Sequence, residues 1–265
     1  MRTLIYYARL YVLIVSQYIK ARMHYRIDFL ISSVGMMCES ICGLFLLWIL
    51  FHSISSLVGW NYNELIFIYA LSLLALTPPY LFFDNIWQLS YHLREGTFIK
   101  FYFKPLNTMF YYMSETFNIK IWTHFLLGIV AFLYASSKLG IVWTFPRLIL
   151  LFLLLFSSSL IMTSLLIMAA STGFWIRESF SIMAFVLRFG EYTRYPLTIF
   201  NNFFRFLFTY IIPIGFVAFY PSKFFLRPTE IDALVYFSPL AGILLFFLAC
   251  LVWKRGVNSW TGTGS

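Results

Sequence analysis

Long apolar stretches separated by short polar ones dominate this chain. Residues 148–174 include no Asp, Glu, Lys, Arg or His. A bilayer core is about 30 Å thick, and a helix needs about 20 apolar residues to cross it. The pattern therefore predicts a membrane-spanning helix. A β-barrel is excluded because its strands would alternate apolar and polar residues over segments of about ten positions.

Six such stretches predict an all-α membrane protein with six transmembrane helices. They are residues 29–51, 65–83, 121–134 with their flanks, 148–174, 197–220 and 233–253. With 265 residues, the spans and their short connections use nearly the whole chain. No stretch is polar and long enough to form a separate soluble domain, so residues 1–265 are interpreted as a single transmembrane domain.

The fifth span is open to two interpretations. Hydropathy places it at residues 197–220, although Arg205 would lie in its first half. Prolines limit regular helix here; they are Pro196, Pro213 and Pro221. The alternative places the span at residues 179–195 and makes 196–230 a re-entrant or outer region. Because the alternative moves basic residues outward, the hydropathy version is preferred.

The first 26 residues differ from a span. Arg2, Arg9, Ser16 and Lys20 fall on one helical face, and aliphatic residues occupy the rest. This pattern predicts an amphipathic helix over residues 1–26 that lies in the membrane interface. A signal peptide is disfavoured because Arg9 interrupts the apolar segment and no small-residue cleavage site follows.

Composition and charge set the orientation. The chain is 61% hydrophobic and only 11% charged, with a formal net charge of +9. With the N-terminus inside, most basic residues fall in inner segments: Arg2, Arg9, Lys20, Arg22, Arg26, Arg94, Lys100, Lys104, Arg177, Arg188, Arg194, Lys254 and Arg255. The positive-inside rule then places both termini in the cytoplasm of a cell-membrane protein. Nucleic-acid binding is disfavoured because the positive charge is dispersed.

Glu39 is the most unusual single residue, because it lies in the middle of the first span. A charge there is costly and usually marks a pathway or a partner. One interpretation is a carboxylate on a translocation path that meets a cation or carries a proton. The other is a protonated side chain that donates one hydrogen bond between helices.

The sequence contains no recognisable set of residues for covalent catalysis or metal binding. Cys38, Cys42 and Cys250 lie in predicted spans without convergent His or carboxylate ligands, so no metal site is expected. The sequence contains no P-loop, H-E-x-x-H or G-x-S-x-G motif. We therefore expect a protein without enzymatic activity and without a cofactor in this chain.

The loop over residues 87–107 is long for a simple connection and mixes aromatic with basic residues. It predicts a short helix at the cytoplasmic surface, either docking a soluble partner or anchoring in the interface. The candidate docking residues are Arg94, Glu95, Gly96, Thr97, Phe98, Lys100, Phe101, Lys104 and Pro105.

Several short motifs resemble a known family. The loop reads LREGT and then KPLN, the later region contains RYPLTIF, IIP and FYPS, and the chain closes with GTGS. Tyr195, Pro196, Pro213 and Pro221 belong to this series. In length, span order and motifs, the chain resembles the ABC-2 type permeases, in particular the short six-span subunits that work with a separate ATPase.

The resemblance implies the transmembrane half of an ABC exporter that moves a hydrophobic or amphipathic substrate by alternating access. ATP and Mg would be bound by a partner ATPase, and a second permease chain would complete the transporter. The loop over residues 87–107 would be the coupling region that inserts into the ATPase. The rival interpretation from another class is a stand-alone secondary carrier or channel that uses Glu39.

Overall fold

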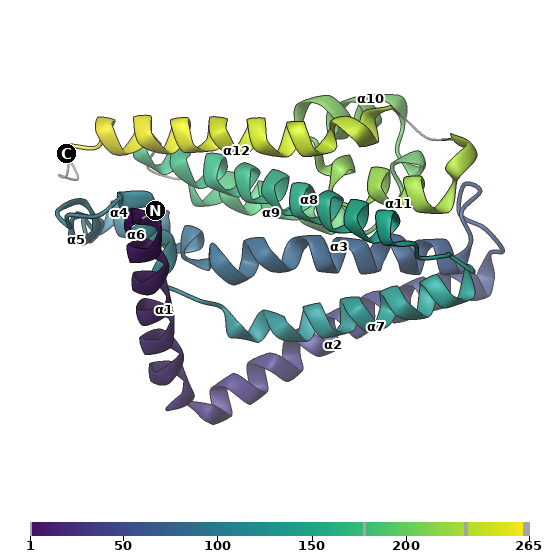
Figure 1. Ribbon diagram of the computed structural model, residues 1–265, viewed down its shortest axis with the longest axis horizontal. Helices are drawn as coiled ribbons and strands as arrows, with labels where there is room; N and C mark the ends of the chain where they lie inside the picture. Colours follow the sequence, from purple (N-terminus) through teal and green to yellow (C-terminus); the bar gives the residue numbers. More distant parts are fainter. Residues whose placement is uncertain (1, 177–178, 231–232, 262–265) are drawn as a thin grey trace.

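The computed structural model describes residues 2–176, 179–230 and 233–261, so the closing GTGS motif and Arg177 lie outside the described residues. Long helices run side by side along the molecule, and no strand occurs in the described part (Figure 1). The main helices are α1 (Arg2–Met23), α2 (Arg26–Ser53), α3 (Tyr62–Phe82), α7 (Trp122–Lys138), α8 (Phe145–Ser171), α9 (Phe180–Tyr192) and α12 (Leu234–Ser259).

Shorter elements connect these helices at the two ends of the bundle. One end holds α1, the termini of the described chain and the short helices η1 (Asp84–Gln88), α4 (Leu89–Arg94), α5 (Ile99–Tyr102), α6 (Thr108–Ser114) and η2 (Ile119–Ile121). We call this the α1 end. Near the opposite end lie η4 (Leu197–Ile199), α10 (Asn202–Phe206), η5 (Leu207–Ile211), η6 (Ile214–Phe216), α11 (Phe219–Leu226) and η7 (Pro228–Glu230).

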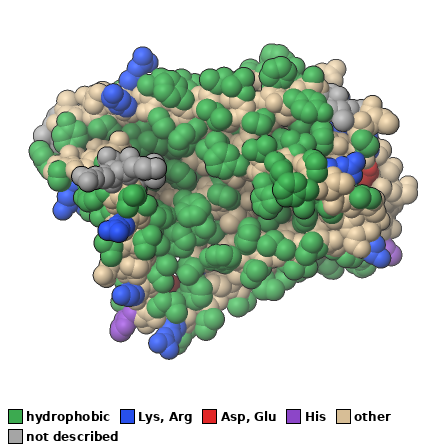
Figure 2. All heavy atoms as spheres, in the orientation of Figure 1, with side chains coloured by type: hydrophobic (Ala, Val, Ile, Leu, Met, Phe, Trp, Pro, Cys, Tyr) green, Lys and Arg blue, Asp and Glu red, His purple; other side chains and the backbone are tan. Residues whose placement is uncertain are grey.

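Five helical segments of the described chain are long and apolar enough to cross a membrane: Arg26–Ser53, Tyr62–Phe82, Ile119–Lys138, Phe145–Phe174 and Leu234–Ser259. They correspond to five of the six predicted spans. Phe145–Phe174 includes the short helix η3 (Thr172–Phe174), which extends α8. In Figure 2, apolar side chains cover the middle of the visible face, as contact with lipid requires.

The preferred prediction for the fifth span is wrong. Residues 197–220 form no continuous helix but a series of short segments from η4 to the start of α11. The helix of this region is α9, which matches the alternative at residues 179–195. Its 13 residues extend about 20 Å, which is short of a full crossing. The chain then folds back against the bundle, where Phe208, Phe216 and Val217 are buried.

Helix α1 does not run parallel to the other long helices. Figure 1 shows it running across the long axis of the other helices and joined to α2 by a sharp elbow. Near its start, the ring of Tyr7 packs against Phe110 of α6 with centroids 4.7 Å apart. The Tyr7 hydroxyl accepts a hydrogen bond of 3.4 Å from the backbone N–H of Asn107. These contacts attach α1 to the short helices.

The core of the bundle is built around α3 and α8. In its most apolar window α3 is 78% buried, whereas α2 is only 11% buried. Three consecutive serines of α8 connect it to three other elements. Ser157 donates to the Ser238 carbonyl of α12, Ser158 to the Phe216 carbonyl of η6 and Ser159 to the Ala75 carbonyl of α3. Such interhelical hydrogen bonds hold helices together in lipid.

Candidate functional site

The predicted coupling region forms a compact hairpin at the α1 end. Helix α4 ends at Arg94, the chain reverses at Gly96, and α5 returns before Asn107 caps α6. Gly96 has a φ of +68°, a left-handed conformation that side chains with a Cβ adopt at a cost. The reversal therefore explains why glycine is at this position. We call residues 87–107 the hairpin.

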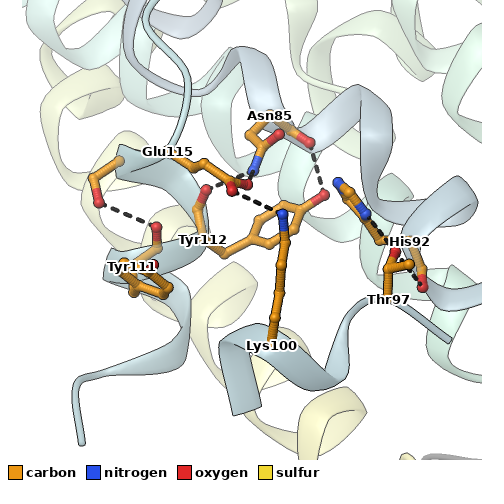
Figure 3. Close-up of polar contacts among 8 residues, drawn as sticks. Asn85, His92, Thr97, Lys100, Tyr111, Tyr112 and Glu115 are labelled. Atoms are coloured by element: carbon orange, nitrogen blue, oxygen red, sulfur yellow. Dashed lines mark hydrogen bonds and ion pairs between the residues drawn. The ribbon is translucent and has the colours of Figure 1, made fainter. Parts of the chain in front are cut away.

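A polar network fastens the base of the hairpin to α6 (Figure 3). The amide of Asn85 donates to the Tyr112 carbonyl at 2.7 Å and the Tyr112 hydroxyl donates to the Asn85 carbonyl at 2.8 Å. Lys100 and Glu115 form an ion pair of 2.8 Å. Burial raises the pKa of Tyr112, so its hydroxyl stays a donor. These reciprocal bonds make η1 and α6 one rigid unit.

His92 closes the turn of the hairpin. Its Nδ1 atom lies 2.7 Å from the Thr97 hydroxyl, across the Gly96 reversal. Burial, and secondarily the positive charge of Lys100, lower the pKa of His92 below its usual value. The neutral imidazole is thus the form that fits the folded hairpin.

Aromatic rings pack between the hairpin and the bundle, and we call this cluster the aromatic cage. It consists of Phe98, Phe101, Tyr112, Phe174, Trp253 and Trp260. Phe98 is fully buried and touches Phe174 at the end of η3, with ring centroids 5.4 Å apart. It also contacts Trp253 and Trp260 at the end of the chain, with centroids 6.3 and 5.1 Å away. The buried ring of Phe101 packs on Tyr112 at 4.7 Å. Through this cage the hairpin is joined directly to the ends of α8 and α12.

The predicted docking residues differ in exposure. Phe98 and Phe101 have no exposed surface, so in this structure neither ring is available for direct contact with a partner. Gly96 is partly exposed at the turn. The exposed set is Arg94, Glu95, Thr97, Lys100, Lys104 and Pro105. The exposed aromatic side chains of Tyr102 and Phe103 lie beside them.

Glu39 has an ionic partner. Its carboxylate lies 3.8 Å from the Arg194 guanidinium, at the end of α9. The Arg194 guanidinium also lies over the Tyr69 ring, 5.4 Å from the centroid. The Arg194 side chain is 19% exposed, whereas that of Glu39 is 62% exposed. The Arg194 side chain therefore lies largely inside the bundle, and the Glu39 side chain faces outward. This places Arg194 in the bundle and not in the inner loop to which its charge was assigned.

Neighbouring polar contacts hold the position of this ion pair. The hydroxyls of Ser72 and Thr193 are 2.6 Å apart, which fixes the residue before Arg194 against α3. The Tyr69 hydroxyl donates to the Ser40 carbonyl at 3.0 Å. Arg194, Tyr69 and the Ser72–Thr193 contact escaped prediction because they come from segments far apart in the sequence. Only the isolated position of Glu39 in an apolar span pointed to the site.

The motif residues organise the broken segment that follows α9. Pro196, buried and extended, precedes η4, and buried Pro213 precedes η6. Pro221 lies in the first turn of α11, where a missing N–H is tolerated. Tyr195, half-buried, follows Arg194 directly. These residues shape the region that replaces the predicted continuous span.

The long apolar helices define a polytopic α-helical membrane protein. The sequence profile of a family described as ABC-2 family transporter protein matches residues 37–264. The chain therefore belongs to the ABC-2 family, and it is a multi-pass membrane permease of an ABC transporter. As a rule, the permeases of this family pair with an ABC ATPase and are transmembrane components without catalytic activity. No curated protein and no solved structure matches the chain.

Proposed function

We propose that the chain is the permease subunit of an ATP-driven exporter in the cell membrane, with both termini in the cytoplasm. A separate ATPase subunit binds ATP and Mg, and a second permease chain, related or identical, completes the translocation path. The substrate is hydrophobic or amphipathic and moves by alternating access. The single observation that carries the proposal is the hairpin, which is at least partly exposed at residues 94–97 and 102–105 and anchored to the bundle at its base. We call these exposed residues its tip.

The hairpin has the two properties that a coupling element requires. Its tip offers exposed charges and apolar surface to a soluble partner, including Arg94, Lys104 and Phe103, which is 76% exposed. Its base passes force through packed rings to the ends of α8 and α12, and through η1 to α3. Packed interiors transmit displacement because they are dense. ATP-driven movement at the tip would therefore reach three spans.

The charge of Glu39 supports a second permease chain. A carboxylate facing lipid at the middle of a membrane is costly, so such groups face the bundle interior or a water-filled cavity. Glu39 lies halfway along α2, and 62% of its side chain is exposed in the single chain. We infer that this face of α2 lines the path between two permease chains, with Glu39 and Arg194 at its middle.

The same ion pair favours the second candidate, a stand-alone carrier. A carrier would move substrate in purified form without nucleotide, and Glu39→Gln would abolish that flux. The exporter instead requires a P-loop partner for every turnover. Purification of the chain alone and flux measurement without ATP therefore separate the two functions.

Copurification with an ATPase tests the proposed function. A tagged chain expressed in its native host should retain an ABC ATPase. Tyr102→Ala combined with Phe103→Ala should release that ATPase, because both rings are exposed at the tip. Phe145→Ala is the matched control, since Phe145 is 77% exposed at the opposite end of the bundle. Equal ATPase recovery from all three proteins would place the docking surface elsewhere.

A further inference from the structure

A groove of 760 Å³ opens at the α1 end of the bundle. Four elements form its walls: α1, the end of α3, α6 and the last turns of α12. All four gather at the same end of the molecule in Figure 1. The sequence predicts that α1 lies in the membrane interface, and α12 is long and apolar enough to span the membrane, so the groove is expected where acyl chains meet headgroups. Its position is distinct from both the exposed tip of the hairpin and the Glu39–Arg194 pair.

The lining of this groove is apolar along its length and positive at its rim. None of its described lining residues is acidic. Lys254 and Asn258 of α12 and Asn107 before α6 add polar groups. The apolar wall includes Phe82, Met109, Phe110, Met113, Phe246 and Cys250. Such a surface is complementary to a molecule with a hydrocarbon tail and a negative head.

Two buried donors of the groove have no hydrogen-bond partner within the described residues. One is the indole N–H of Trp253, a residue only 3% exposed, and the other is the hydroxyl of Tyr11. Burial raises the pKa of Tyr11 to about 12, so its hydroxyl keeps its proton near neutral pH. An unsatisfied buried donor costs about 1–3 kcal/mol. Both atoms are covered by protein, so a ligand oxygen in the groove would reach them only after neighbouring side chains shift.

We propose that this groove binds one anionic phospholipid of the leaflet in which α1 lies. The acyl chains pack on the phenylalanine and methionine wall. The negative head pairs with Lys254, and the headgroup oxygens accept from the exposed side-chain amides of Asn107 and Asn258. Trp253, which lines the groove, contacts the buried ring of Phe98, so the lipid touches the support of the hairpin. The proposal needs the membrane placement of the chain but not transport or an ATPase.

Native mass spectrometry of the purified chain tests this lipid site. The probes are phosphatidylglycerol and phosphatidylcholine with identical acyl chains, titrated onto delipidated protein. The wild-type chain should bind one phosphatidylglycerol with higher affinity than phosphatidylcholine. Lys254→Gln should weaken phosphatidylglycerol binding about fivefold, the effect of one basic residue near an anionic headgroup. Arg255→Gln, which removes the neighbouring charge outside the groove, should leave it unchanged.

A further variant separates binding in the groove from general attraction to the surface. Cys250→Trp should fill the groove and eliminate the single tight site. Equal affinity of the wild-type chain for the two lipids would overturn the proposal. So would equal losses in Lys254→Gln and Arg255→Gln, or full lipid retention by a folded Cys250→Trp chain.

Discussion

At the scale of single residues, the ion pair of Glu39 with Arg194 combines two charges that the membrane would otherwise disfavour. Each charge lowers the cost of placing the other at mid-depth, where an unpaired charge would need a cavity or a deformation of the bilayer. The Tyr69 ring adds a cation–π contact on the buried side. The two charges are therefore coupled. A chain that keeps only one of them should be less stable than a chain that lacks both.

A double-mutant cycle tests this coupling. Glu39→Gln and Arg194→Gln should each lower thermal stability in detergent, because each leaves one charge unpaired. The double variant should lose less than the two single losses together, with a coupling energy of about 0.5–3 kcal/mol. Additive losses would show that the two side chains do not interact.

The lowered pKa of His92 predicts a pH dependence of the hairpin. A base whose pKa is lower in the folded state contributes stability above its unfolded value of about 6.5, and this contribution is lost as pH falls through the folded pKa. The protection factors of the hairpin amides, corrected for intrinsic exchange, should therefore fall as the pH decreases below about 6.5. His92→Gln should flatten this dependence after correction for intrinsic exchange. An identical profile in the variant would exclude His92 as the cause.

The sequence revealed one half of the ion pair but not the other. A charge within a long apolar run is visible in the sequence, so Glu39 was an obvious candidate. Arg194 lies among other charged residues and looked like part of a loop. Only tertiary packing brings it to α2, and neither periodicity nor charge pattern carries that information.

At the scale of elements, α2 approaches α3 closely at Gly43. A Cβ added at Gly43 would lie 2.3 Å from the Tyr69 hydroxyl. That hydroxyl is bonded to the Ser40 carbonyl, and its ring lies under Arg194. Helix α2 also contains Gly35, where an added Cβ would meet nothing within 4 Å. The two glycines thus provide a matched comparison.

Gly43→Ala should destabilise the chain by about 1–3 kcal/mol, the usual effect of overpacking, because Tyr69 must move and lose its hydrogen bond. Gly35→Ala should be neutral or slightly stabilising, since alanine favours helix. Thermal unfolding of the two variants in detergent measures the difference. Equal midpoints would contradict the close contact between α2 and α3.

The long helices were predictable, but the broken fifth region was not. Hydropathy records that residues are apolar and not whether lipid or protein surrounds them. Residues 197–220 are apolar because rings such as Phe208 and Phe216 pack against the bundle. Their prolines indicated interrupted helix, yet the continuous apolar run outweighed them. The sequence predicted a short helix within residues 87–107, and α4 and α5 lie there. The inward direction of Phe98 and Phe101 depends on a cage assembled from three distant segments.

At the scale of the whole molecule, the proposed orientation places the α1 end in the cytoplasm. In a background with Cys38, Cys42 and Cys250 replaced by Ser, a cysteine at Thr97 should resist an impermeant thiol reagent in intact cells and react after lysis. A cysteine at Gly140, between α7 and α8, should react in intact cells. The reverse pattern would invert the topology.

The account makes one central claim: the hairpin transmits the work of a separate ATPase to this permease. The most direct measurement is the ATP turnover of that ATPase in proteoliposomes, with and without the chain and any second permease it requires. We predict that the chain raises turnover, and that Tyr102→Ala combined with Phe103→Ala abolishes the increase while Phe145→Ala retains it. Full stimulation by the hairpin variant, or substrate flux through the purified chain without nucleotide, would contradict the claim.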